Sequence, residues 1–254
     1  MQYFRHIFAI FLILIAATSL TGCDKNKSAH TGTQFSDAEL YDKSIMLVEA
    51  QKYDKAVNVI EDLELEYPTS QFIPNAMYIK AKTLYGKRRY DEALVTIDMF
   101  TKQFPYDERV EELLFIKGLC HYDQVMDVGR DQKISEEALS IFGELLEQYP
   151  QSRYRVEAKL KMEYLTALLA GKQMEIGYFY YQKHNYSGAL RRFQNVYEDF
   201  STTIFVPEAL YRISEIFLIL NIPEEANTYA AILGANFPES EWYHKLYKII
   251  KDDE

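Results

Sequence analysis

The histidine, carboxylate and nucleophile patterns of a sequence indicate whether it can carry out catalysis or hold a metal ion. None of the five histidines in this 254-residue chain belongs to an HExxH pattern, the spacing that places two imidazoles on one helix face for zinc. The sequence also has no GxSxG turn, P-loop or glycine-rich dinucleotide turn. We therefore predict no catalytic site, no metal site and no cofactor. The histidines are His6, His30, His121, His184 and His244.

Adjacent carboxylates, which can share acid–base work, occur at Glu61–Asp62 and Glu111–Glu112. Both pairs lie in helical patterns whose opposite faces are apolar. The simpler interpretation is a charged face in contact with water, and we expect both pairs to lie there.

The two cysteines have different surroundings. Cys120 lies in the apolar helical stretch "LLFIKGLCHY", where a small buried hydrophobic residue is expected. Cys23 lies where an apolar run gives way to a polar one, and two cysteines make no disulfide framework. Upstream of Cys23, "MQYFRH" carries Arg5 and no acid, an apolar run extends over residues 7–17, and "SLTG" supplies small residues. This layout is typical of a secretory signal, and the run is shorter than the ~18 to 20 residues that a membrane-spanning helix needs.

The tetrapeptide Leu20-Thr21-Gly22-Cys23 resembles the lipobox of bacterial lipoproteins. The resemblance implies that residues 1–22 are a signal peptide, and that Cys23 becomes the first mature residue with diacylglycerol on its thiol and an acyl chain on its amine. The polar residues 23–34 are then a flexible, lipid-anchored linker. The alternative is a plain signal with a coincidental cysteine.

The net negative charge of the chain argues against some classes of binding partner. The formal net charge is -10 and the isoelectric point is about 5.1. Residues 1–22 contain one arginine and no acid, so the mature chain has 27 basic against 38 acidic residues, a balance of -11. Nucleic acids and anionic membrane surfaces require clustered lysine and arginine, so we expect no nucleic acid partner and anchoring through lipid.

From residue 35 one pattern recurs five times. An alanine is followed by apolar residues four, seven and eleven positions later in all five copies, and one position later in four of them, which places them on one helix face. A proline stands twelve residues after the alanine in four of the five copies and ends the helix. The alanines are Ala56, Ala93, Ala138, Ala189 and Ala226.

A second helical pattern precedes each of these helices, so the pairs repeat every ~34 to 37 residues and resemble the tetratricopeptide repeat. We predict an all-α, right-handed α-solenoid over residues 35–251, with the amphipathic stretch "ESEWYHKLYKII" as its C-terminal capping helix. The five predicted repeats are 36–69, 72–106, 107–151, 153–201 and 204–238.

Two pairs are longer than the others. The third contains eight extra residues, which we place in a charged loop at "DVGRDQK", residues 127–133. The fourth contains fourteen, about four helical turns, which would extend one helix by ~21 Å and return nearly the same face to its neighbours. We favour a single long helix over one broken at Gly171 or Gly177.

The lipobox, the repeats, "GLCHY", "RDQ", "YPQSRY" and "LLAGKQMEIGYFYYQKHNYSGALRRFQNVYEDF" together resemble the BamD (ComL) family of outer-membrane assembly lipoproteins. The resemblance implies a non-enzymatic subunit of the β-barrel assembly (Bam) complex, anchored in the outer membrane and facing the periplasm. It implies unfolded outer-membrane proteins, other Bam lipoproteins and a POTRA domain of a BamA-like barrel subunit as partners. The alternative is another repeat lipoprotein of the envelope, such as a pilotin or a Tol-associated or cell-division factor.

The first helices line the inner curve in the tetratricopeptide family, and its ligand-facing positions fall on aromatic residues here. These residues are predicted to hold an extended or C-terminal peptide, and the alternative is that some fill gaps between helices. The candidates for this substrate groove are Tyr41, Tyr78, Tyr85, Phe115 and Tyr122, with Tyr211 at the matching place in the fifth pair.

The family resemblance also places an arginine that binds the barrel subunit on Arg192 in "ALRRFQ", with Arg191 as the alternative register. A guanidinium there could pair with a POTRA carboxylate through two hydrogen bonds, whereas an exposed arginine is more often only a solubilising charge. Asp24 raises a different question, because an aspartate after the lipidated cysteine retains lipoproteins in the inner membrane of enteric bacteria. We expect this organism to sort differently.

Overall fold

The computed structural model describes residues 35–128 and 132–252. The chain divides into Met1–Ser36 and Asp37–Glu254, and all the helices discussed here lie in the second unit. The predicted signal peptide, the linker, Cys23 and Asp24 lie outside the described residues.

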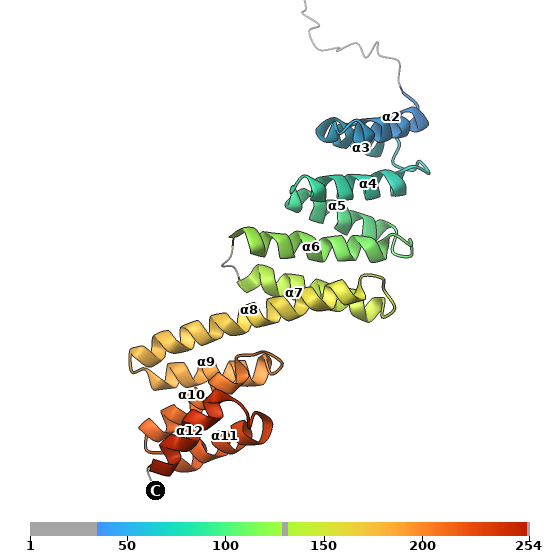
Figure 1. The fold of residues 1–254 in the computed structure, drawn as a ribbon. Helices are drawn as coiled ribbons and strands as arrows, with labels where there is room; N and C mark the ends of the chain where they lie inside the picture. Colours follow the sequence, from blue (N-terminus) through green and yellow to red (C-terminus); the bar gives the residue numbers. More distant parts are fainter. Residues whose placement is uncertain (1–34, 129–131, 253–254) are drawn as a thin grey trace, which may run out of the picture. The chain divides into compact units, whose positions relative to one another are not determined.

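The described part of the chain is all α-helical, as predicted, with eleven helices and no strand (Figure 1). The helices are α2 Asp37–Glu49, α3 Tyr53–Glu66, α4 Ile73–Gly86, α5 Tyr90–Gln103, α6 Val110–Val128, α7 Gln132–Gln148, α8 Arg155–Gln182, α9 Tyr186–Asp199, α10 Val206–Ile219, α11 Pro223–Asn236 and α12 Glu241–Asp252.

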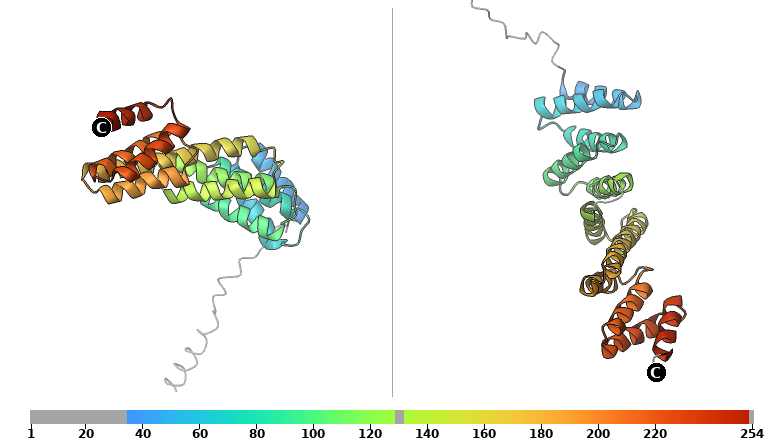
Figure 2. Two further views of the ribbon diagram at one scale, coloured as in Figure 1. Left: turned by 90° about the horizontal axis from the view of Figure 1, so that it is seen from below. Right: turned by 90° about the vertical axis from the view of Figure 1, so that its left-hand side faces the viewer.

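Consecutive helices stack as antiparallel pairs, and one pair lies within each predicted repeat range (Figures 1 and 2). The second helix of each pair also packs on the first helix of the next pair. The last helix, α12, packs on α10 and α11 and buries Leu246 completely. The predicted α-solenoid of the tetratricopeptide type is therefore confirmed.

The repeated alanines explain how closely the paired helices approach. All five have no exposed surface, as expected for small residues where two helices pack closely. In two pairs the first helix has a glycine at its contact with the second helix, so no side chain separates the two. A Cβ on Gly118 would lie 2.4 Å from the ring of Phe142, and one on Gly177 would lie 2.5 Å from the ring of Phe193. Each phenylalanine ring thus packs directly on the backbone of the helix before it.

Three of the four loops between pairs, and the loop before α12, share one feature. A small polar residue accepts a hydrogen bond from the backbone N–H two positions later, which fixes the entry into the following helix. The residues in this role are Ser70, Asp107, Ser152 and Ser240. Inside the pairs, the turn after the first helix places one residue in the left-handed region, with φ between 56° and 59° at Gln51, Arg88, His184 and Asn221.

The predicted charged loop at residues 127–133 is largely wrong. Helix α6 continues to Val128 and α7 begins at Gln132, so most of the eight extra residues lengthen these two helices. Residues 129–131 lie outside the described part of the chain.

The preferred prediction for the fourth pair is confirmed, because α8 is one helix of 28 residues with no break at Gly171 or Gly177. Gly177 is there because Phe193 packs on the backbone at that position, and Gly171 faces the ring of Phe205. Helix α8 also joins two apolar clusters. Leu165 belongs to the cluster that extends back to α2, and Ala170 belongs to the one formed with α9 and α10.

The glycine contacts yield a test of this packing. Gly177→Ala should destabilise the fold by about 1–3 kcal/mol, because its methyl group would overlap the Phe193 ring. Gly143→Ala in α7 meets no neighbour within 4 Å and should stabilise the fold by about 0.5–1 kcal/mol. Urea unfolding of both variants measures the two effects, and equal stabilisation by both would contradict the close packing at Gly177.

Candidate peptide-binding and docking surfaces

Aromatic residues occupy the same place in four of the first helices. Three of them pack on a residue from the loop that enters the next repeat, and the fourth, Tyr211, packs on Trp242 in the capping helix α12. Three of these contacts are ring on ring and one is a guanidinium over a ring. The pairs are Tyr41 with Phe72 at 4.9 Å, Tyr78 with Arg109 at 5.9 Å, Phe115 with Tyr154 at 4.4 Å and Tyr211 with Trp242 at 5.2 Å. These aromatic residues therefore contribute to the packing between neighbouring helices, which is the alternative to a role in binding peptide.

For Phe115 the prediction of a substrate-facing side chain is wrong. Only 5% of its surface is exposed, because its ring lies between Tyr154 and the ring of Phe142. Tyr211 is likewise buried, under Trp242. These two rings belong to the core.

Three other candidates are half-buried and lie on three successive first helices. The Tyr41 hydroxyl accepts a hydrogen bond from Asn75, and the Tyr85 hydroxyl donates to Asp123 at 2.9 Å. Burial, followed by this hydrogen bond, raises the pKa of Tyr85. The ring of Tyr122 lies 4.2 Å from the Lys161 ammonium. Tyr41, Tyr85 and Tyr122 do not line the apolar pocket that Tyr78 borders.

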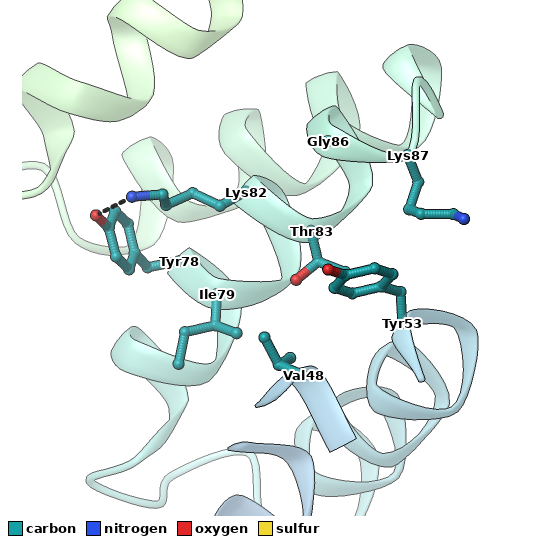
Figure 3. Close-up of a pocket in the computed structure, with 8 residues that line it drawn as sticks. All are labelled: Val48, Tyr53, Tyr78, Ile79, Lys82, Thr83, Gly86 and Lys87. Atoms are coloured by element: carbon teal, nitrogen blue, oxygen red, sulfur yellow. Dashed lines mark hydrogen bonds between the residues drawn. The ribbon is translucent and has the colours of Figure 1, made fainter. Parts of the chain in front are cut away.

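Tyr78 is the predicted groove residue that borders an apolar pocket. The pocket has a volume of about 410 Å³ and opens between the first pair and α4 (Figure 3). Two ammonium groups, on Lys82 and Lys87, stand at an otherwise mostly apolar wall, and the Lys87 ammonium lies 5.6 Å from the ring of Tyr53. The lining residues are Val48, Tyr53, Tyr78, Ile79, Lys82, Thr83, Gly86 and Lys87.

The Glu112 carboxylate binds several side chains beside this pocket. It accepts hydrogen bonds from the Lys82 ammonium at 2.8 Å, the Tyr78 hydroxyl at 2.9 Å and the Arg153 guanidinium at 2.8 Å. Burial opposes its ionisation, but the bonds from Lys82 and Tyr78 outweigh burial and hold the pKa of this carboxyl below its usual value. The hydrogen bond to Glu112 raises the pKa of Lys82.

The prediction that Glu111 and Glu112 form a purely solvated face is therefore wrong. Glu112 has a side chain that is only 19% exposed, and Glu111 accepts a hydrogen bond from Ser152 at 2.6 Å. Both lie where two repeats meet, and they also border a polar cleft of about 560 Å³ that shares Tyr78 with the apolar pocket. The Glu61–Asp62 pair is exposed, as expected.

Arg191 and Arg192 both border one shallow hollow of about 280 Å³ at the turn between α8 and α9. Arg191 is exposed, and Arg192 is half-buried and donates to the Gln173 side chain at 3.0 Å. Asn185 caps α9 by accepting from the Gly188 N–H at 3.1 Å, which fixes the first turn that carries the arginines. Arg191 and Arg192, the two alternatives for the predicted docking residue, thus line the same hollow.

Cys120 is fully buried and free, as predicted, and burial raises the pKa of its thiol to about 12. Within residues 35–128 and 132–252, no three His, Cys, Asp or Glu side chains gather as metal ligands would. In the same residues, no helix combines the length and the apolar character needed to cross a membrane.

Comparisons with known proteins place the chain among named relatives. The sequence model of a family described as "YfiO: Outer membrane lipoprotein" matches residues 33–233. The chain is 31% identical over 240 residues to the outer membrane protein assembly factor BamD of Rickettsia prowazekii, covering 94% of this chain and 95% of that one. It is 38% identical over 135 residues to the BamD of Caulobacter vibrioides, covering 53% and 44%. A solved tetratricopeptide-repeat protein of Thermus thermophilus aligns with a TM-score of 0.37 and 18% identity, covering 85% of this chain and 99% of that one.

The Glu112 network should make stability depend on pH. Since the pKa of Glu112 is lowered by folding, its contribution is present above its ordinary pKa of 4.5 and is lost as the pH falls through the lower, folded value. Glu112→Gln should cost about 1–3 kcal/mol near pH 7, and the cost should shrink below pH ~4.

Urea unfolding at several pH values measures this difference. The matched control is Glu147→Gln, which makes the same change at an exposed site and should stay within about 0.5 kcal/mol. A cost for Glu112→Gln that stays constant from pH 7 to pH 3 would contradict the role given to the carboxylate.

Proposed function

The chain belongs to the YfiO family of outer membrane lipoproteins, and we propose that it acts as a non-enzymatic outer membrane protein assembly factor in a BamD-like subunit role. The family resemblance predicted from sequence is thereby confirmed. The observation that carries the proposal is the alignment with the Rickettsia prowazekii assembly factor, which spans nearly the whole of both chains.

We place the chain at the outer membrane through lipid on Cys23, with the solenoid in the periplasm. The lipobox tetrapeptide that ends at Cys23 and the description of the family as lipoproteins support this anchor. In this proposal Asp24 does not retain the protein in the inner membrane.

The apolar pocket beside Tyr78 is the proposed site for the end of an unfolded outer-membrane protein. Its volume of about 410 Å³ accommodates an aromatic or large aliphatic side chain. Lys82 is already paired with Glu112, whereas Lys87 contacts the Tyr53 ring at the pocket wall and can turn its ammonium toward a carboxylate. This combination suits a peptide that ends in an apolar residue with a free C-terminal carboxylate.

A peptide pair tests this assignment. A ten-residue peptide that ends in phenylalanine with a free carboxylate should bind the chain about tenfold more tightly than the same peptide with a C-terminal amide, since one charged hydrogen bond is worth about 1.5–3 kcal/mol. Lys87→Ala should remove most of this preference, and Lys55→Ala, at an exposed site on α3, should leave it unchanged. Fluorescence anisotropy measures the affinities. Equal binding of acid and amide would refute the site.

The hollow at Arg191 and Arg192 is the proposed docking point for a POTRA domain of a BamA-like barrel subunit. The described structure gives Arg192 one hydrogen bond, to Gln173, and a guanidinium has five N–H donors. It therefore retains donors for a carboxylate of the partner, and exposed Arg191 beside it adds positive charge. Other Bam lipoproteins are proposed to bind elsewhere on the same solenoid.

Charge reversal tests the docking point. Arg192→Glu should lower co-purification of the barrel subunit from detergent-solubilised membranes by about tenfold or more, because it replaces a charged hydrogen bond by repulsion. The control is Lys102→Glu, an equal change at an exposed site on α5, which should have no effect. Undiminished recovery with Arg191→Glu and Arg192→Glu combined would exclude the hollow as the docking point.

A further inference from the structure

The first half of α8 has a strip of exposed apolar residues, whereas the second half has Phe179 as its exposed large apolar residue. The exposed apolar residues of the first half follow each other at intervals of four, which forms a continuous strip along the helix. Together with the two charged residues beside the strip they are called the α8 ledge here. The ledge consists of Val156, Lys159, Leu160, Glu163, Tyr164 and Leu168.

The length of α8 explains why the ledge is uncovered. Helix α8 has 28 residues and α9, which runs back along it, has 14, so the two are about 42 Å and 21 Å long. Figure 1 shows α9 along the C-terminal half of α8 only. The next repeat packs on α8 near its middle, where Gly171 faces the ring of Phe205. The first half of α8, about 21 Å of helix, therefore extends beyond α9.

The ledge is the same helix face that α9 covers further along. A shift of fourteen residues is close to four whole turns, so Val156 corresponds to Ala170 and Leu160 corresponds to Met174. Ala170 and Met174 are 0% and 3% exposed in the cluster formed with α9, whereas Val156 and Leu160 are 64% and 61% exposed. Two large apolar side chains thus stand in water where their counterparts are buried by a helix.

We propose that the α8 ledge is a docking site for an amphipathic α-helix supplied by a different protein. The buried half of α8 shows that a helix fits this face, and the ledge presents the same i, i+4 apolar rows. Lys159 and Glu163 lie beside the apolar strip, so the incoming helix would carry opposite charges at its flanks.

The size of the ledge argues for a partner rather than a second copy of this chain. A contact of about three helical turns on one helix is well below the roughly 1,200–2,000 Å² that a stable dimer buries. It is sufficient for a helix of a protein that is held near the chain by another contact or by the same membrane, because tethering raises its effective concentration.

Photocrosslinking in intact cells tests the proposal. A photoreactive amino acid in place of Lys159 should link to another envelope protein at a segment with apolar residues three and four positions apart. Val156→Lys combined with Leu160→Lys should lower this yield tenfold or more, since two buried aliphatic contacts are lost. A synthetic peptide of that segment should bind the purified chain as a helix and lose affinity to the same extent in the double variant.

Two controls separate the ledge from other effects. Leu65→Lys changes an exposed leucine on α3 and should leave the yield unchanged, and a photoreactive residue in place of Lys55 should not link to the same segment. The double variant should retain the Arg192-dependent binding of the barrel subunit, so failure here is distinguishable from failure of the proposed function. Crosslinks to lipid, to a second copy or to an extended segment, a yield that the double variant does not change, or no crosslink at all would each overturn the proposal.

Discussion

Each repeat of this protein can bury its apolar face only against the repeat beside it, and this nearest-neighbour packing determines the rest of the structure. The contacts that carry it are specific. An aromatic ring or guanidinium from each of three entry loops packs on the aromatic residue of the preceding first helix, and Trp242 of α12 does the same on Tyr211. Within two of the repeats, Phe142 and Phe193 pack on the backbone of the paired helix at glycines. Within residues 35–128 and 132–252, the main helix contacts join helices of the same or of adjacent repeats.

The candidate sites lie where that packing is incomplete. The apolar pocket opens at the junction between the first two repeats, next to the place where Tyr78 meets a guanidinium instead of a ring. The hollow at Arg191 and Arg192 lies at a turn inside one pair, beside the first residues of α9. Both candidate surfaces thus lie at places that differ from the ring-on-ring packing of the other junctions.

Periodicity predicted the helix pairs, the buried alanines and the long α8, because these features depend on residues close together in the sequence. It did not predict that Phe115 is buried, since the ring that covers it, Tyr154, comes from a loop 39 residues later. The role of Glu112 was missed for the same reason, because its partners Lys82 and Arg153 lie in the neighbouring repeats. The signal that was available is the spacing of about one repeat between Tyr78, Glu112 and Arg153, which brings the three side chains together where successive repeats meet.

The unbroken α8 has a mechanical consequence. Arg153, two residues before this helix, is tied to Glu112 beside the apolar pocket, and Gln173 within it holds Arg192 at the docking hollow. A continuous helix resists bending, since bending strains its backbone hydrogen bonds. The helix therefore forms a continuous connection between the two candidate sites, with no loop between Arg155 and Gln182.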